Sequence, residues 1–103
     1  MIKKIRKRII DEKQYEFSLH AVNQSILRKI TLEEMHDCIE NGEIIEDYPH
    51  DKYGSSCLIF GYTAKNRPIH IQCSYPSRTK IKIITIYEPE RNEWIDFNIR
   101  RKR

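Results

Sequence analysis

The sequence predicts an α+β fold in which two N-terminal helices pack on one face of a roughly four-stranded antiparallel sheet. Apolar residues recur at helical spacing up to about residue 41, and both helix starts carry capping residues. From about residue 43 the apolar residues alternate with polar ones, and turns rich in Gly, Pro, Asn and Asp separate the runs. Because a helix must bury its apolar stripe against another element, we expect the sheet to cover both helices.

Residues 1–17 fit two interpretations. Ile5, Ile9 and Ile10 have helix-like spacing, whereas Tyr15 and Phe17 alternate as they would in a short strand. Both interpretations remain open.

The first expected helix runs from about residue 19 to residue 28. Ser18 suits the N-cap position because its side-chain oxygen can accept a hydrogen bond from an amide of the first turn. Leu19, Val22 and Ile26 fall on one face of this helix, so we expect that face to enter the core.

The second expected helix begins with a capping box, in which Thr31 reaches forward and Glu34 reaches back. It continues to about Asn41, and its core side is formed by Leu32, Met35 and Ile39. Gly42 is well placed to end it in the left-handed conformation.

Four strands follow the helices. They are expected at residues 43–48, 56–63, 68–75 and 80–88. The third alternates clearly, with Ile69 and Ile71 on one side and His70 and Gln72 on the other. The fourth becomes apolar on both faces, as is typical of a central strand. We expect the sheet face opposite the helices to be left for solvent or a ligand.

Size and charge limit the organisation of the protein. The chain has 103 residues, which suits one domain spanning residues 1–103. Nine of its 19 Lys and Arg residues lie in two basic ends, residues 1–8 and 100–103, and the rest of the chain has more acidic than basic side chains. Basic ends of this kind either bind phosphates or act as solubilising tails.

Several classes of protein are disfavoured by what the sequence lacks. No apolar run approaches the ~20 residues needed to cross a bilayer, and no signal peptide follows the basic start, so we expect a cytoplasmic protein without membrane contact. Cys38, Cys57 and Cys73 form no C-x-x-C pair, and we expect them to be core residues. The histidines lack metal-ligand spacing, and no glycine loop suits a phosphate, so we expect neither a metal nor a cofactor.

A series of short motifs runs through the chain. The motifs are S-x-H-A at 18–21, T-L-E-E at 31–34, N-G-E-I-I-E-D-Y-P at 41–49, P-I-H at 68–70 and I-I-T-I-Y-E-P at 83–89. In this order they resemble a known bacterial family, the one called domain of unknown function 4258, over about residues 15–97. The family is similar in organisation to the small RelE-like and BrnT-like toxins, which cut or block RNA during translation.

The resemblance implies a set of site residues. It places the histidines of the family at His20 and His70, its helix arginine at Arg28 and its last-strand tyrosine at Tyr87. Gln24 stands where the family commonly has another arginine, which removes one cation from the expected anion-binding face. We therefore take as catalytic candidates His20, His70 and Tyr87, and as substrate-binding candidates Gln24, Arg28 and Arg78.

These residue types suit cleavage of RNA through its own 2′-hydroxyl. Histidine serves as acid or base near neutral pH, arginine matches phosphate with two parallel hydrogen bonds, and tyrosine donates a proton or stacks on a base. Each residue also has a structural interpretation. His20 would orient its helix, Arg28 would complement the helix dipole, His70 would be structural or solvated, and Tyr87 would pack in the core.

The leading hypothesis is a toxin-like component of a bacterial toxin–antitoxin system, acting as a metal-independent RNA endonuclease. Its expected partners are RNA and a cognate antitoxin protein. The alternative is a non-catalytic module that binds a protein or a nucleic acid, and a third hypothesis is a structural or regulatory domain. The sequence leaves the oligomeric state open.

Overall fold

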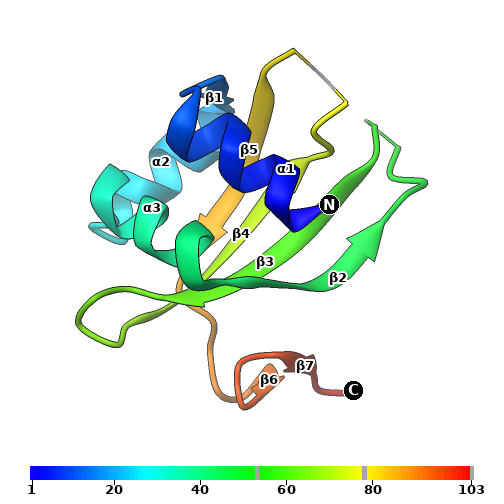
Figure 1. Ribbon diagram of the computed structural model, residues 1–103. Coiled ribbons are helices and arrows are strands. Elements are labelled where there is room, and N and C mark those ends of the chain that lie inside the picture. Colours follow the sequence, from blue (N-terminus) through cyan, green and yellow to red (C-terminus); the bar gives the residue numbers. More distant parts are fainter. Residues whose placement is uncertain (53, 78, 103) are drawn as a thin grey trace.

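Figure 1 shows the computed structural model, which describes residues 1–52, 54–77 and 79–102. The helical segments are α1 (Ile2–Arg6), the π-helical turn η1 (Lys7–Asp11), α2 (Leu19–Leu27) and α3 (Leu32–Asn41). The strands are β1 (Tyr15–Phe17), β2 (Glu43–Tyr48), β3 (Ser56–Tyr62), β4 (Pro68–Ser74), β5 (Ile81–Tyr87), β6 (Trp94–Ile95) and β7 (Ile99–Arg100). The helices gather over one face of the main sheet, and the β6–β7 hairpin lies apart from them (Figure 1).

The main sheet has five strands in the order β1-β5-β4-β3-β2. Strands β2 to β5 pair antiparallel, as predicted, but β1 joins the edge of β5 in parallel, with Tyr15 opposite Ile81. The α+β class is confirmed. The prediction of two helices on a four-stranded antiparallel sheet is wrong in detail, because the described residues form a mixed sheet and include a further helix at the start.

The first seventeen residues contain both structures that their sequence pattern suggested. Residues 2–11 are helical and bury Ile5 and Ile9 completely, while Tyr15–Phe17 form β1. Arg6 from this helix donates from Nε to the Ile39 carbonyl (2.9 Å) and from Nη2 to the Gly42 carbonyl (2.6 Å). Arg6 therefore satisfies carbonyls at the end of α3, where a helix leaves them without partners.

The core lies between the helices and the sheet. Its buried members come from every layer and include Ile5, Met35, Ile39, Ile59, Ile69, Ile71, Ile83 and the three cysteines. The expectation that Cys38, Cys57 and Cys73 are core residues is thus confirmed. Among the described residues, no helix has the length and apolar character required to cross a membrane.

Helix α3 follows its prediction at the start and departs from it at the end. Thr31 and Glu34 form the expected capping box. Gly42 ends the helix, but with an extended backbone (φ −83°) and not the left-handed one that we expected. A glycine is required there for a different reason, since a Cβ at Gly42 would lie 2.2 Å from the Cys38 carbonyl oxygen.

Helix α2 turns the opposite face to the sheet from the one predicted. Ser18 caps it as expected, accepting from the Ala21 amide. Ala21 is buried, whereas Leu19 and Ile26 are 77% and 69% exposed. The prediction that the Leu19 face enters the core is therefore wrong.

The reason for this orientation lies at the edge of β5. Strand β1 pairs with β5 only as far as Ile83, so the rest of that edge needs other hydrogen-bond partners. Ser18 Oγ donates to the Ile84 carbonyl (2.8 Å), and Gln24 Oε1 accepts from the Ile86 amide (2.9 Å). Supplying these bonds places the Ala21–Gln24 side of α2 against the sheet and leaves the apolar side outside.

The sheet face opposite the helices is covered over one part. Trp94 of the β6–β7 hairpin is 2% exposed and packs against His70, with ring centroids 4.4 Å apart. Arg100 fixes the hairpin further, since its Nη2 lies 3.0 Å from Glu46 Oε1 and its guanidinium stacks over the Trp94 ring. The expectation that this whole face is left for solvent or a ligand is wrong for the half around His70.

Candidate functional site

His70 is completely buried beneath the C-terminal hairpin. Its Nε2 lies 2.6 Å from the Phe97 carbonyl oxygen, so this nitrogen donates, and its Nδ1 lies 3.1 Å from the Tyr87 hydroxyl. Asp96 and Phe97 form a turn with positive φ (50° and 63°), a conformation that is costly for a bulky residue such as Phe97. The imidazole therefore holds this turn on the sheet, and both of its nitrogens are occupied.

Burial favours the neutral form of His70. Loss of hydration lowers the pKa of His70, against the opposing effects of the Phe97 carbonyl and of Glu46. Burial also raises the pKa of Tyr87, which therefore keeps its proton at neutral pH. The structure thus joins His70 to Tyr87, two of the predicted catalytic residues, but in a place where His70 attaches the hairpin and Tyr87 hydrogen-bonds its imidazole.

A pH dependence of stability follows from this environment. His70 binds a proton at a lower pH in the folded state than in the unfolded state, so acid favours unfolding. We expect the free energy of unfolding to fall as pH drops below about 6.5, with a slope approaching 1.4 kcal/mol per pH unit. Urea denaturation of the wild type and His70→Gln at pH 7.5 and pH 5.5 measures this. His20→Gln is the control and should follow the wild type; equal acid sensitivity in His70→Gln would contradict the assignment.

The other predicted site residues lie elsewhere. His20 and Arg28 are exposed on α2 and at its end, on the helical side of the sheet, whereas His70 points to the opposite side. The side-chain oxygen of Gln24 accepts a hydrogen bond from the Ile86 amide at the edge of β5. Arg78 falls outside the described residues, and its role stays a prediction. The structure therefore does not bring His20 and His70 together.

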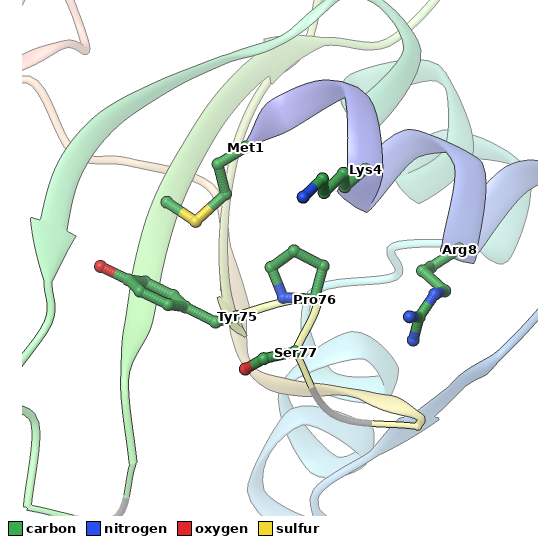
Figure 2. A pocket seen from close by; sticks show the side chains of 6 residues that line it. All are labelled: Met1, Lys4, Arg8, Tyr75, Pro76 and Ser77. Atoms are coloured by element: carbon green, nitrogen blue, oxygen red, sulfur yellow. The ribbon is translucent and has the colours of Figure 1, made fainter.

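A basic surface cavity lies where the N-terminal helix faces the end of β4. It has a volume of about 570 Å³ and is lined by Met1, Lys4, Arg8, Tyr75, Pro76 and Ser77. Figure 2 shows Met1, Lys4 and Arg8 projecting from the helix, with Met1 beside the Tyr75 ring, Lys4 near Pro76 and Arg8 at the end away from Tyr75. We call this the basic cavity.

The polar groups of the basic cavity are held in defined positions. Arg8 donates from Nη1 to the Thr79 carbonyl (3.2 Å), and its Nε lies 4.0 Å from Glu12 Oε1. Tyr75 donates its hydroxyl to Asp47 Oδ1 (2.5 Å), and this bond raises the pKa of Tyr75 to about 12. The Lys4 side chain is exposed. The cavity thus presents an ammonium, a guanidinium and the Ser77 hydroxyl, which are groups that bind phosphate oxygens.

Further cations and hollows surround the basic cavity. Lys3 and Lys7 are exposed on the same helical segment. Tyr75 and Ser77 also line a neighbouring hollow of about 550 Å³, together with Ser74 and Lys82. The two hollows therefore share one wall, and Asp51 brings a carboxylate to the second of them.

Sequence reasoning found only part of this site. It identified the basic run in residues 1–8 as a feature able to bind phosphates, but it left the structure of that segment open. Nothing in the local sequence indicates that the turn after β4 lies opposite Lys4, because that proximity depends on the tertiary fold. Among the described residues, no group of three or more His, Cys, Asp or Glu side chains is placed to hold a metal ion.

Comparison with known families agrees with the motif pattern. Residues 17–88 match the family described as Domain of unknown function (DUF4258). The chain belongs to this family. The DUF4258 segment contains His20, His70 and Tyr87, whereas Lys4 and Arg8 precede it. No curated protein and no solved structure matches the chain.

Proposed function

We propose that the protein is a non-catalytic RNA-binding module that holds phosphate groups at the basic cavity. The observation that carries this proposal is the position of Lys4 and Arg8 across from Ser77, around a hollow of about 570 Å³. Electrostatic attraction to phosphates supplies most of the affinity in sequence-independent binding of nucleic acids. Lys3 and Lys7 are also exposed on this helical segment and add to its positive charge.

The placement of the histidines favours binding over cleavage. A base that activates a 2′-hydroxyl must lie within hydrogen-bond reach of it. His70 is 0% exposed, and both of its ring nitrogens have protein partners. His20 is exposed on the other side of the sheet, so the two imidazoles cannot act on the same phosphodiester.

A toxin-like role is an extension of this proposal. It is supported by the similarity in organisation between the DUF4258 family and the RelE-like and BrnT-like toxins. In that role, the protein would block RNA by binding it, and a cognate antitoxin would be its protein partner. The metal-independent endonuclease is the weaker form of the hypothesis, because it needs an accessible acid–base pair.

Removing the two cations of the basic cavity is expected to weaken RNA binding about tenfold. In the double variant Lys4→Ala/Arg8→Ala, the slope of log K against log salt concentration should decrease by about 0.7 for each phosphate that is no longer neutralised. Fluorescence anisotropy with a labelled single-stranded RNA measures both quantities across a salt series. The matched control is Lys29→Ala/Lys65→Ala, which removes two exposed cations that lie outside both basic ends.

Two results would contradict the proposal. Equal weakening in both double variants would show a general effect of net charge, and failure of the wild type to bind RNA would remove the function altogether. The same RNA, recovered after incubation and resolved on a denaturing gel, should remain intact. Cleavage that disappears in His20→Ala would restore the endonuclease hypothesis.

A further inference from the structure

Two of the three cysteines stand directly opposite each other on neighbouring strands of the main sheet. Cys57 on β3 pairs with Cys73 on β4 in the antiparallel register, and both belong to the core between the sheet and the helices. Both residues are 0% exposed, and both are free thiols. The register therefore places two buried thiols side by side on one face of the sheet.

The backbone spacing of this pair lies within the range of a disulfide. The Tyr75 amide donates to the Ser55 carbonyl (3.0 Å), and hydrogen-bonded pairs alternate with non-hydrogen-bonded ones along an antiparallel ladder. Cys57 and Cys73 lie two positions from that pair, so they too form a hydrogen-bonded pair, with Cα atoms about 5.5 Å apart. Disulfides span Cα separations of about 4.4–6.8 Å, so a bridge can form without a change of strand register.

We propose that Cys57 and Cys73 are a reversible redox pair, which a peroxide oxidises to a disulfide between β3 and β4. First, the Cys57 thiolate attacks the peroxide and its O–O bond breaks. One oxygen stays on the sulfur as a sulfenic acid, and the other leaves as hydroxide, which becomes water with the proton that Cys57 has lost. Then the Cys73 sulfur attacks the Cys57 sulfur, the S–O bond breaks, and the oxygen leaves as water with the Cys73 proton. The two thiols thus give up two electrons, and the peroxide is reduced to two molecules of water.

The order of the two steps follows from the surroundings of the thiols. The hydrogen bond with Cys73 lowers the pKa of Cys57, and the Met1 amine acts in the same direction, against burial and the charge of Asp47. The same bond and burial raise the pKa of Cys73. Because the thiolate is the reactive form, Cys57 is the thiol that attacks peroxide, and Cys73 closes the bridge.

Peroxide reaches the pair through local opening at the end of the ladder. Ser56 with Ser74 is the last pair of this ladder, next to the cysteines. No side-chain hydrogen bond caps α1 at Met1, which lines the basic cavity together with Tyr75, two residues after Cys73. The ends of elements open more often than their centres. We therefore expect the folded protein to be oxidised, but more slowly than an exposed thiol.

The geometry of the pair also makes the bridge easy to reduce. In a hydrogen-bonded pair the Cβ atoms are about 5.5 Å apart, whereas a disulfide holds them about 3.8 Å apart. Closing this gap pulls the two strands together and strains the bridge. Strained disulfides are the ones that small thiols open, so we expect reduced glutathione to restore the thiols.

Mass spectrometry of the folded wild type tests the proposal. The protein is treated with hydrogen peroxide, its remaining thiols are alkylated, and circular dichroism confirms that it is folded. The wild type should lose two hydrogens in mass and carry a single alkyl group, on Cys38. Peptide mapping should place the bridge between Cys57 and Cys73, and reduced glutathione should return three alkylatable thiols.

Cys38→Ala provides the matched control. A Cβ at Gly61 would lie 2.2 Å from the Cys38 carbonyl oxygen, which places Cys38 beside a residue four positions along β3 from Cys57. Four residues of a strand span about 13 Å, too far for a disulfide. Burial, with Asp37 and Glu34, also raises the pKa of Cys38 to about 12. Cys38→Ala should therefore form the bridge as the wild type does.

Two single variants test the order of the steps. In Cys73→Ala the reaction should stop at a sulfenic acid on Cys57, which dimedone traps, whereas Cys57→Ala should form neither a bridge nor a trapped sulfenic acid. A folded wild type that keeps three thiols would overturn the proposal, as would a bridge that includes Cys38 or one that reduced glutathione leaves intact. So would a bridge that forms only in urea, where the cost of loop closure changes slowly with length and all three pairings compete.

Discussion

Replacing His70 with alanine is expected to lower the free energy of unfolding by about 3 kcal/mol or more. The substitution leaves a void beneath Trp94 and Phe60, and it removes the hydrogen-bond donor of the Phe97 carbonyl. Emptying a packed site and leaving a buried polar group unpaired are both costly. Urea denaturation followed by tryptophan fluorescence measures the change, since Trp94 reports directly on the position of the hairpin.

Two further variants test whether the imidazole of His70 stabilises the hairpin. His20→Ala, at an exposed position, should change stability by less than about 0.5 kcal/mol. His70→Gln retains hydrogen-bonding groups and should lose less stability than His70→Ala. If His70→Ala were as stable as the wild type, the hairpin would not depend on the imidazole, and the buried position would need another explanation.

Replacing Gly61 with alanine is expected to destabilise the protein by about 3 kcal/mol or more. A Cβ at this position would lie 2.2 Å from the Cys38 carbonyl oxygen and 2.8 Å from the Cys38 Cα. Both atoms belong to the backbone of α3, so rotation of a side chain cannot relieve the clash. Strand β3 and helix α3 would have to separate, which would disturb the centre of the core. The midpoint of urea denaturation, with the yield of folded protein, measures the effect.

Gly54 provides the control for this prediction. A Cβ there meets nothing within 4 Å, but the backbone has a positive φ of 115°. Gly54→Ala should therefore cost about 1 kcal/mol from backbone strain alone. A similar loss in both variants would mean that the packing of α3 on β3 tolerates a methyl group.

The strands and the caps could be predicted from sequence because their signals are local. Thr31 and Glu34 satisfy each other within one turn, and the alternation around His70 correctly separates its side of β4 from the core side of Ile69 and Ile71. Alternation does not indicate which neighbour a strand takes, nor its direction. The parallel pairing of β1 with β5 could therefore not be predicted from the alternation of apolar and polar residues.

Helix α2 shows where periodicity misleads. Its apolar stripe predicts a buried face, but the open edge of β5 needs hydrogen bonds that Ser18 and Gln24 supply from the other side. The hydrogen bonds of Ser18 and Gln24 fix the orientation of α2, because turning the Leu19 and Ile26 side inward would take these partners away from the Ile84 carbonyl and the Ile86 amide. The candidate site could not be predicted from the sequence either, because the basic cavity joins segments from distant parts of the chain.

The pairing of β1 with β5 has a consequence for how the protein is made. On a ribosome, Lys4 and Arg8 emerge well before Tyr75 and Ser77, and β1 has no strand to pair with until β5 has followed it. Contacts between such distant segments close slowly. The phosphate-binding surface that we propose would thus form late in folding, because it needs Tyr75 and Ser77 to be placed opposite Lys4 and Arg8.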